Sequence, residues 1–153
     1  MSTDEVDADW LRLDNQICFA LHAASRAFTA LYRDTLDELG LTYSQYLVML
    51  VLWERGPLPV KQIGEHLRLD SGTLSPLLKR LEANGLVVRE RSAADERSVT
   101  VRPTEAGAAL RERAVELPRR AAEATGLDLF EVTELRDRIV RLTESLDAAT
   151  TAG

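Results

Sequence analysis

Cys18 is the single cysteine among 153 residues, and it is the side chain of this sequence with the most evident redox chemistry. A cysteine within an apolar stretch such as Ile17-Cys18-Phe19-Ala20-Leu21 is most often an inert, buried hydrophobe. His22 lies four residues further, on the same face of a helix, where an imidazolium favours the reactive thiolate. At this point the residues leave both interpretations open, an inert core cysteine and a reactive thiol.

Tyr32 follows Cys18 by fourteen residues, which is nearly four helical turns. The two side chains therefore face about the same way but lie about 21 Å apart along the helix axis. If two copies of the helix cross antiparallel near Ser25, each Cys18 comes opposite the Tyr32 of the other copy. Residues 23–27 are mostly small, which permits such a close crossing, and a symmetric dimer then has two equivalent thiol sites.

Most enzyme and metal signatures are absent from the sequence. One cysteine excludes an internal disulfide framework and a cysteine-rich zinc site. There is no GxSxG elbow, no glycine-rich phosphate loop and no histidine pair at metal-binding spacing. His66 is interpreted as a surface or packing residue rather than a ligand. We therefore expect no enzyme activity, no cofactor and no metal.

The charge is unevenly distributed. The formal net charge of −6 argues, taken alone, against nucleic acid as a partner. Residues 57–105, however, carry eight basic and seven acidic residues, so the acidity belongs to the flanking segments. The middle of the chain is thus a candidate anion-binding segment, with a mixed solvated surface as the alternative.

Nothing in the sequence indicates export or membrane insertion. No run approaches the roughly 18 apolar residues of a membrane span, and the first five residues include Asp4 and Glu5 and no basic residue, where a secretory signal is basic. We expect no membrane association and a location in the reducing cytoplasm.

The hydrophobic spacing predicts a mainly helical chain. One long helix over residues 14–38 ends at Gly40, and a second runs from 42 to 54 before a proline-rich break at 57–59. A third over 60–67 and a fourth over 71–84 are joined tightly, with the leucines of the fourth at helical spacing and Asp70 or Ser71 as its cap. A helix from Glu105, interrupted or kinked by Pro118, and a last helix over 128–148 with a frayed tail follow the hairpin described next.

Two short strands, 86–91 and 98–102, flank the polar segment 92–97 and predict a β-hairpin with a charged tip. Helix-turn-helix followed by such a hairpin is a winged helix, so the expected fold class is mainly α with a small β-hairpin wing (α+β). We divide the chain into N-terminal helices (10–56), a winged helix-turn-helix region (57–104) and C-terminal helices (105–149); the resemblance described below implies dimerisation and sensing for the first, DNA binding for the second and dimerisation for the third.

The outer face of the 71–84 helix is suited to a DNA major groove, because short hydroxyls and helix N-termini donate to phosphates and base edges. The candidate residues are Ser71, Gly72, Thr73, Ser75, Pro76, Lys79 and Arg80. Gly72, four residues before Pro76, relieves the crowding that a proline causes within a helix. The alternative is a merely exposed amphipathic helix.

Arg97, at the hairpin tip, is a candidate for a narrow A·T-rich minor groove, where the negative potential attracts a guanidinium. Asp95 is positioned to orient Arg97 by a charge-assisted hydrogen bond. Arg89 is expected to meet phosphates. The predicted partner is therefore double-stranded DNA.

Several segments resemble a known family. Residues 70–82 (DSGTLSPLLKRLE), 95–99 and 104–107 resemble the MarR family of winged-helix transcription regulators. Residues 13–21 (LDNQICFAL), together with Tyr32 and Tyr43, resemble its organic-hydroperoxide-sensing OhrR branch. The resemblance spans about residues 10–147. Members with a second, resolving cysteine have no counterpart here, so the chain resembles the one-Cys type.

The resemblance implies a homodimeric repressor with Cys18 as peroxide sensor, hydrogen-bonded by Tyr32 and Tyr43 of the other subunit. It also implies a pseudo-palindromic operator, released on oxidation, and an external low-molecular-weight thiol that reacts with the oxidised cysteine. Some members have a tyrosine at the position of His22, which puts the role of His22 in thiol activation in question. The alternatives are a regulator that releases DNA on binding a small aromatic ligand, and a thiol peroxidase.

Overall fold

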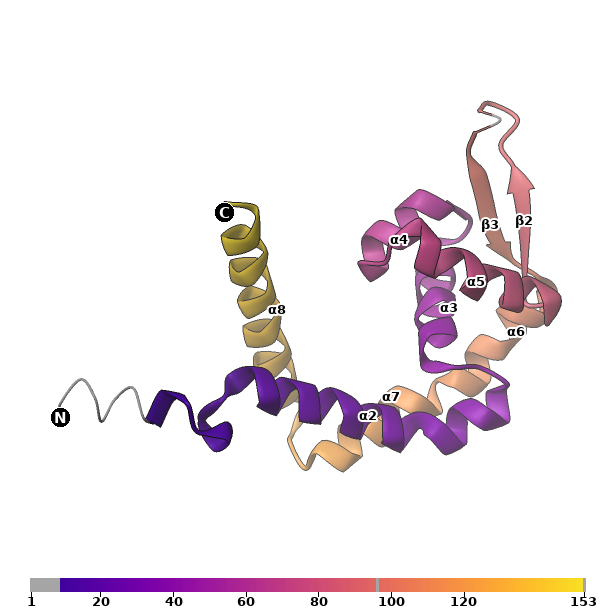
Figure 1. Cartoon of the computed structure of the whole chain (residues 1–153). Helices are drawn as coiled ribbons and strands as arrows, with labels where there is room; N and C mark the ends of the chain where they lie inside the picture. The colour runs from indigo at the N-terminus through magenta and orange to yellow at the C-terminus, as the bar shows by residue number, and fades with distance from the viewer. Residues whose placement is uncertain (1–8, 96, 153) are drawn as a thin grey trace. The chain divides into compact units, whose positions relative to one another are not determined.

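The computed structural model describes residues 9–95 and 97–152 and is mainly helical with one small sheet (Figure 1). Contacts group the chain into one compact unit that extends to Ala114 and a second that begins at Val115. The helices of the first unit are η1 (Leu13–Asn15), α2 (Ile17–Leu39), α3 (Tyr43–Arg55), α4 (Val60–Leu67), α5 (Ser71–Ala83) and α6 (Glu105–Ala114), and its strands are β1 (Leu58–Pro59), β2 (Val87–Arg91) and β3 (Val99–Pro103). The second unit contains α7 (Glu116–Thr125) and α8 (Leu129–Thr151).

The predicted fold class is confirmed, with shifts at several boundaries. Among the described residues, no helix has the length and apolar character needed to cross a membrane.

The long helix α2 begins at Ile17, three residues after the predicted start. Gln16 is extended (φ −86°, ψ 111°), and its side-chain amide donates to the carbonyls of Trp10 and Arg12. These bonds keep the preceding turn outside the helix, so Cys18 lies in the first turn of α2. At the other end Gly40 takes the left-handed conformation (φ 71°) and ends the helix as predicted.

Helix α3 supplies the centre of the first unit. Thr42 and Gln45 form a reciprocal capping box at its start, with bonds of 3.3 and 3.0 Å. Val48, Met49 and Leu52 are fully or almost fully buried. The helix therefore anchors the elements that follow it.

The α4–α5 connection is tight because of one glycine. A Cβ on Gly64 would lie 2.7 Å from the Leu69 carbonyl oxygen, so a larger residue would push the two helices apart. Leu74, Leu78 and Leu81 of α5 are buried, as their spacing predicts, which leaves the opposite face of α5 to solvent.

The sheet has three antiparallel strands in the order β1-β3-β2. Strand β1 was not predicted, since the proline-rich segment 57–59 was interpreted as a break between helices, yet Leu58 pairs with Val101. Val87 and Val101 point into the core. β2 and β3 extend as the predicted wing, closed by a bond from the Ser92 amide to the Ser98 carbonyl (2.8 Å).

The start of helix α6 is hydrogen-bonded to the residues just before β2. The Thr104 hydroxyl donates to the Gly85 carbonyl (2.6 Å), and the Thr104 amide donates to the Leu86 carbonyl (3.0 Å). A Cβ on Gly107 would lie 2.1 Å from the Leu86 oxygen. The indole of Trp53 donates to the Gly107 carbonyl (2.9 Å), so α3, β2 and α6 meet at this glycine.

The helix that begins at Glu105 is interrupted at Val115, between α6 and α7, rather than at Pro118 itself. Proline has no N–H and its ring clashes with the carbonyl four residues earlier, here that of Ala114, where α6 ends. Helix α8 starts at a capping box of Asp128 and Glu131 and continues to Thr151, past the predicted end and through most of the predicted frayed tail. None of the described residues of α8 is buried.

Candidate functional site

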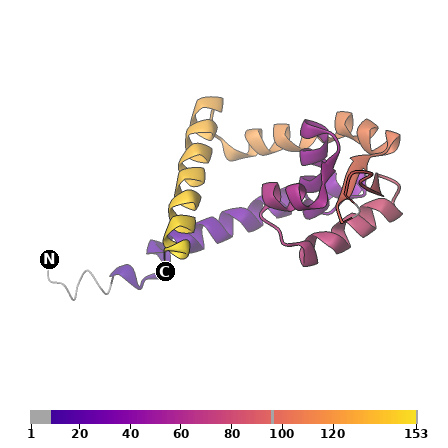
Figure 2. The ribbon, with the colours of Figure 1, turned by 90° about the horizontal axis from the view of Figure 1, so that it is seen from above.

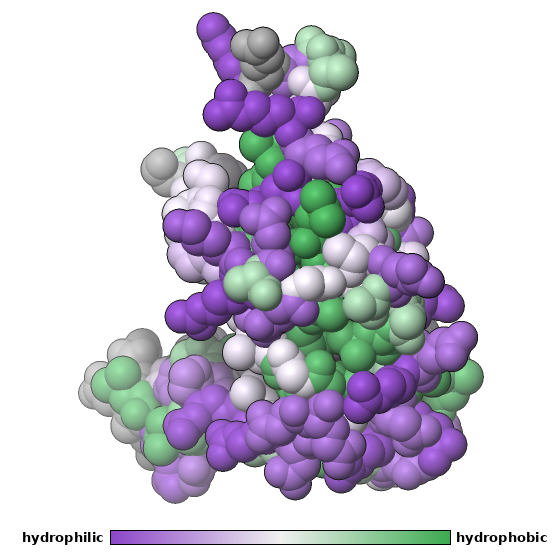
Figure 3. Space-filling view, turned by 90° about the vertical axis from the view of Figure 1, so that its right-hand side faces the viewer, coloured by the Kyte–Doolittle hydropathy of each residue, from purple (hydrophilic) through white to green (hydrophobic). Residues whose placement is uncertain are grey.

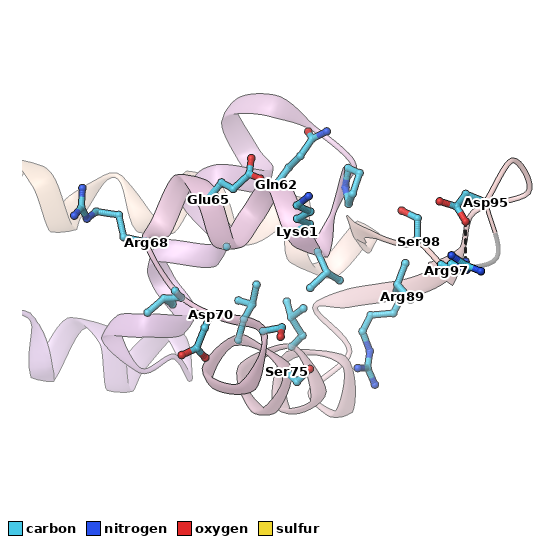
Figure 4. Close-up of a pocket in the computed structure, with 18 residues that line it drawn as sticks. Lys61, Gln62, Glu65, Arg68, Asp70, Ser75, Arg89, Asp95, Arg97 and Ser98 are labelled. Carbon is cyan, nitrogen blue, oxygen red and sulfur yellow. Dashed lines mark hydrogen bonds between the residues drawn. The ribbon is translucent and has the colours of Figure 1, made fainter. Parts of the chain in front are cut away.

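A groove of about 960 Å³ lies between α4, α5 and the β2–β3 wing (Figure 4). Its basic lining residues are Lys61, Arg68, Arg89 and Arg97. Lys61 and Gln62, on α4, were not among the candidates from the sequence. A signal for them exists, because the first helix of a helix-turn-helix crosses the DNA backbone and Lys61 stands at its start.

The outer face of α5 presents every residue that the sequence predicts there. The exposed residues are Ser71, Gly72, Thr73, Ser75, Pro76, Lys79 and Arg80. The N-terminal amides of the helix, however, are partly occupied: the Asp70 carboxylate accepts from the Thr73 amide at 2.7 Å. This bond, with further bonds from the Thr73 hydroxyl and the Gly72 amide, holds the pKa of Asp70 below its usual value. The face therefore offers side chains more readily than bare backbone amides.

The wing tip is shaped by Asp95, but through a different bond from the predicted one. The Asp95 carboxylate accepts from the backbone amide of Arg97 (3.0 Å; dashed line in Figure 4), and the Asp95 carbonyl accepts from the Ser98 amide (3.0 Å). Asp95 thus orients Arg97 by fixing its backbone. Hydrophilic residues gather on the protruding wing (Figure 3).

Two other arginines near the wing are engaged in ion pairs. Arg89 pairs with Glu82 of α5 at 3.1 Å, and Arg102 pairs with Glu90 across the wing at 3.0 Å. Arg89 lines the groove as expected for a phosphate contact, but its charge is already compensated.

Cys18 is exposed, as are its neighbours Ile17 and Phe19 at 65% and 44%. The chain therefore does not bury the thiol as an inert core residue. His22, one turn further along α2, is also exposed. Among the described residues no cluster of His, Cys, Asp and Glu has a metal-binding arrangement.

Tyr32 and Tyr43 belong to an aromatic cluster with Phe28 and Tyr46. The rings of Tyr32 and Tyr43 stack with centroids 5.9 Å apart, and Tyr46 meets Tyr32 edge-on at 6.3 Å. Burial, followed by the neighbouring tyrosines, raises the pKa of Tyr32 and raises that of Tyr46 to about 12. Tyr46 was predicted from the sequence as a buried residue of its helix but not as a member of this cluster, although its position three residues after Tyr43 puts both on one helix face.

The structure brings Tyr32 and Tyr43 together but leaves Cys18 apart from them within the chain. Cys18 and Tyr32 lie on one continuous helix, α2, whose first half extends away from α3, α4 and α5 (Figures 1 and 2). Fourteen residues of helix separate them by about 21 Å.

Comparison with known proteins decides the family. The family model described as transcriptional regulator SarA/Rot matches residues 30–113. The chain is 46% identical over 138 residues to the organic hydroperoxide resistance transcriptional regulator of Bacillus subtilis, covering 90% of this chain and 94% of that protein. The chain belongs to the MarR family of transcription regulators.

Further relatives of this MarR-family regulator agree. The HTH-type transcriptional regulator TtmR of Methylorubrum extorquens is 48% identical over 136 residues, covering 89% of this chain and 70% of that protein. A solved structure of reduced AbfR bound to DNA matches with a TM-score of 0.79 and 38% identity, covering 92% of this chain and 96% of that one. The chain is therefore a DNA-binding transcription regulator and not an enzyme, as the sequence predicts.

Proposed function

We propose that this MarR-family regulator is a homodimeric repressor that releases its operator when an organic hydroperoxide oxidises Cys18. The observation that carries the proposal is the exposed thiol of Cys18 in the first turn of α2, flanked by exposed apolar residues. Such a regulator acts in the cytoplasm, where its operator DNA is.

The DNA-binding surface consists of the exposed face of α5 and the wing. Ser71, Thr73 and Ser75 lie at the N-terminal end of α5, where a recognition helix contacts base edges. Lys79 and Arg80 lie further along the same exposed face and contact phosphates of the DNA backbone. Arg97 enters a narrow, A·T-rich minor groove. Two such surfaces in a symmetric dimer require a pseudo-palindromic operator with half-sites about 34–36 Å apart.

Dimerisation is supported by apolar surface that the single chain leaves uncovered. From Ile17 to Ala30 α2 has no buried residue, and Phe19 and Phe28 are more than 40% exposed. On α8 Leu129 and Phe130 are 82% and 75% exposed. Exposed large apolar side chains gathered on one helix in this way are typical of an interface.

An antiparallel crossing of two α2 helices near Ser25 completes the thiol site. It sets each Cys18 opposite the partner's Tyr32, which Tyr43 supports by stacking. Cys18 lies in the first turn of α2, next to the N–H groups and the positive end of the helix dipole. His22 lies one turn away on the same helix.

The chemistry balances with the peroxide as oxidant. The thiolate sulfur attacks one peroxide oxygen, the O–O bond breaks, and the departing alkoxide takes a proton to become an alcohol. Cys18 is left as a sulfenic acid. Because the chain has no second cysteine, an external low-molecular-weight thiol condenses with the sulfenic acid to a mixed disulfide and water.

Operator release follows from geometry. A bulky adduct at the α2 crossing, with loss of the tyrosine hydrogen bonds, tilts the subunits and changes the spacing of the two α5 helices. That spacing must match one helical turn of DNA.

The oxidation step is tested by trapping the sulfenic acid. Reduced protein is treated with one equivalent of cumene hydroperoxide in the presence of dimedone and analysed by mass spectrometry, with hydrogen peroxide in parallel. We expect a dimedone adduct at Cys18 that forms faster with cumene hydroperoxide. No adduct, together with DNA release by salicylate, would favour a regulator that senses aromatic acids, and sustained peroxide turnover with an added thiol would favour a peroxidase.

A further inference from the structure

One carboxylate holds Arg89 at the junction of α5 and β2. Glu82 accepts from the Arg89 backbone amide at Oε2 (3.0 Å) and from the Arg89 guanidinium at Oε1, with Nε at 3.4 Å and Nη2 at 3.1 Å. These bonds, that of the backbone amide foremost, hold the pKa of Glu82 below its usual value. At neutral pH the carboxylate is ionised and compensates the charge of Arg89.

The bond from the backbone amide is possible because β2 lies at the edge of the sheet. Arg89 is opposite Val101 in the β2–β3 register, and its amide donates to Glu82 of α5. Glu82 thus caps the free edge of the sheet at this position. It connects the C-terminal half of α5 directly to the lower part of the wing.

A junction here controls where the wing tip lies. The five residues of β2 extend about 17 Å, so a tilt of about 10° at the base displaces the tip by about 3 Å. Arg97, near the tip, must reach DNA while α5 occupies the neighbouring groove. The Arg102–Glu90 pair, by contrast, joins β3 to β2 within the wing.

We propose that Glu82 and Arg89 form a strut that sets the angle of the wing relative to α5, with Arg89 as a positioning residue rather than a phosphate contact. The inference rests on the proposed binding of operator by this face. If Arg89 turned to a phosphate, the unpaired Glu82 carboxylate would be left beside the DNA backbone, where like charges repel. In this proposal Arg89 holds the wing in position, instead of contacting phosphates as expected from the sequence.

The salt dependence of DNA binding separates the two roles. Each phosphate contact contributes about −0.9 to the slope of log K against log salt concentration. Reduced full-length protein is titrated by fluorescence anisotropy with a duplex of the DNA upstream of its own gene, at several KCl concentrations. Arg89→Met is expected to weaken binding about tenfold at every concentration with an unchanged slope. A slope reduced in magnitude by about 1 would overturn the proposal.

Arg89→Lys sharpens the test, because lysine keeps a phosphate contact but cannot reproduce the forked bonds to Glu82. We expect it to bind as weakly as Arg89→Met, and binding at wild-type strength would overturn the strut. Glu82→Gln should weaken binding no more than Arg89→Met does, and neither should the double variant. If the fold-losses of the two single variants multiplied in the double variant, the two residues would act independently and a shared role would be contradicted. Glu90→Gln and Arg102→Met, on the other ion pair, are matched controls with less than about twofold effect.

The strut is also measured without DNA. Amide hydrogen exchange in the wing of the free protein is expected to be faster in Glu82→Gln than in the wild type and in Glu90→Gln. Unchanged exchange would overturn the strut whatever the DNA result. If the wild type binds no duplex while the exchange rates differ as expected, the proposed function fails and the strut stands as a structural feature.

Discussion

The winged helix-turn-helix, residues 57–104 (the winged segment), and the helix α2, which carries Cys18, differ in one respect. They differ in how many of the interactions that each needs are formed within a single chain. In the winged segment Asp70 caps α5, Asp95 fixes the backbone of Arg97, and Glu82 binds Arg89, all within one subunit. On α2, Cys18 and Tyr32 share one helix and lie about 21 Å apart. The first surface is complete in the single chain, whereas the thiol site proposed above needs a second copy of the chain.

This difference suggests how one signal can reach the DNA. A surface built within a subunit keeps its own geometry when the subunits move, so oxidation need not damage it. In the proposed dimer the thiol site lies at the contact between the subunits, so its oxidation changes that contact. The proposal therefore attributes release to a changed separation of two intact DNA-binding surfaces rather than to unfolding of either.

The largest expected effect tests whether one chain alone stabilises the winged segment. Gly107→Ala places a Cβ 2.1 Å from the Leu86 carbonyl oxygen, a backbone atom that cannot move aside cheaply. We expect a loss of at least about 3 kcal/mol in the free energy of unfolding. Thermal unfolding at two protein concentrations measures it, with Gly72→Ala as control, since its Cβ meets only the Asp70 side chain at 3.4 Å. A loss that disappears at high protein concentration would show that the segment depends on the dimer.

The next effect concerns the wing tip. Arg97→Ala should weaken operator binding by about 1–3 kcal/mol without changing the response to peroxide. The loss should be smaller on a duplex whose minor-groove positions are changed from A·T to G·C. Anisotropy titration at fixed salt measures both, with Arg102→Ala as the control on the same wing. Unchanged affinity of Arg97→Ala would remove this residue from the interface.

Mixed subunits sharpen the second half of the comparison. In the Tyr32→Phe homodimer the rate of Cys18 oxidation by cumene hydroperoxide should fall about tenfold. The Cys18→Ser homodimer should not respond at all. A heterodimer of the two variants contains one intact site, because the wild-type Cys18 of one chain meets the wild-type Tyr32 of the other. Its remaining thiol should therefore oxidise at the wild-type rate. Oxidation at the slow Tyr32→Phe rate would mean that Tyr32 acts within its own chain.

The smallest effect is the pH dependence of the aromatic cluster. The pKa of Tyr46 is raised to about 12 in the folded chain, while an unfolded tyrosine ionises near 10.0. Between these values the unfolded state binds fewer protons, so this contribution to stability is present below pH 10 and is lost as the pH rises toward 12. Urea unfolding across this range measures the loss, and Tyr46→Phe should reduce the slope. An equal slope in both proteins would mean that groups other than Tyr46 cause the pH dependence of stability in this range.

Much of the winged segment could be predicted because its signals are local. The leucine spacing of α5, the Asp70 cap and the polar tip between two strands each act over a few residues. Strand β1 could not be predicted, since the two residues Leu58 and Pro59 have no strand pattern of their own and form a strand only by pairing with β3. The Glu82–Arg89 pair likewise depends on how the turn at Gly85 brings a helix and a strand together.

The candidate sensor residues could be named from the sequence, but their surroundings could not. Gln16 reads as a good helix residue, and only its bonds to the carbonyls of Trp10 and Arg12 move the start of α2 to Ile17. That shift places Cys18 in a first turn. The contact between Tyr46 and Tyr32 depends on how α2 packs on α3, which no spacing within one helix reveals.

Operator release by the wild type and Cys18→Ser tests the central claim most directly. Both reduced proteins are bound to the DNA upstream of the gene and treated with cumene hydroperoxide, and the bound fraction is followed by gel shift. We predict that both bind equally before treatment, that the wild type releases the DNA, and that Cys18→Ser stays bound. Release of Cys18→Ser at the wild-type peroxide concentration would contradict the account.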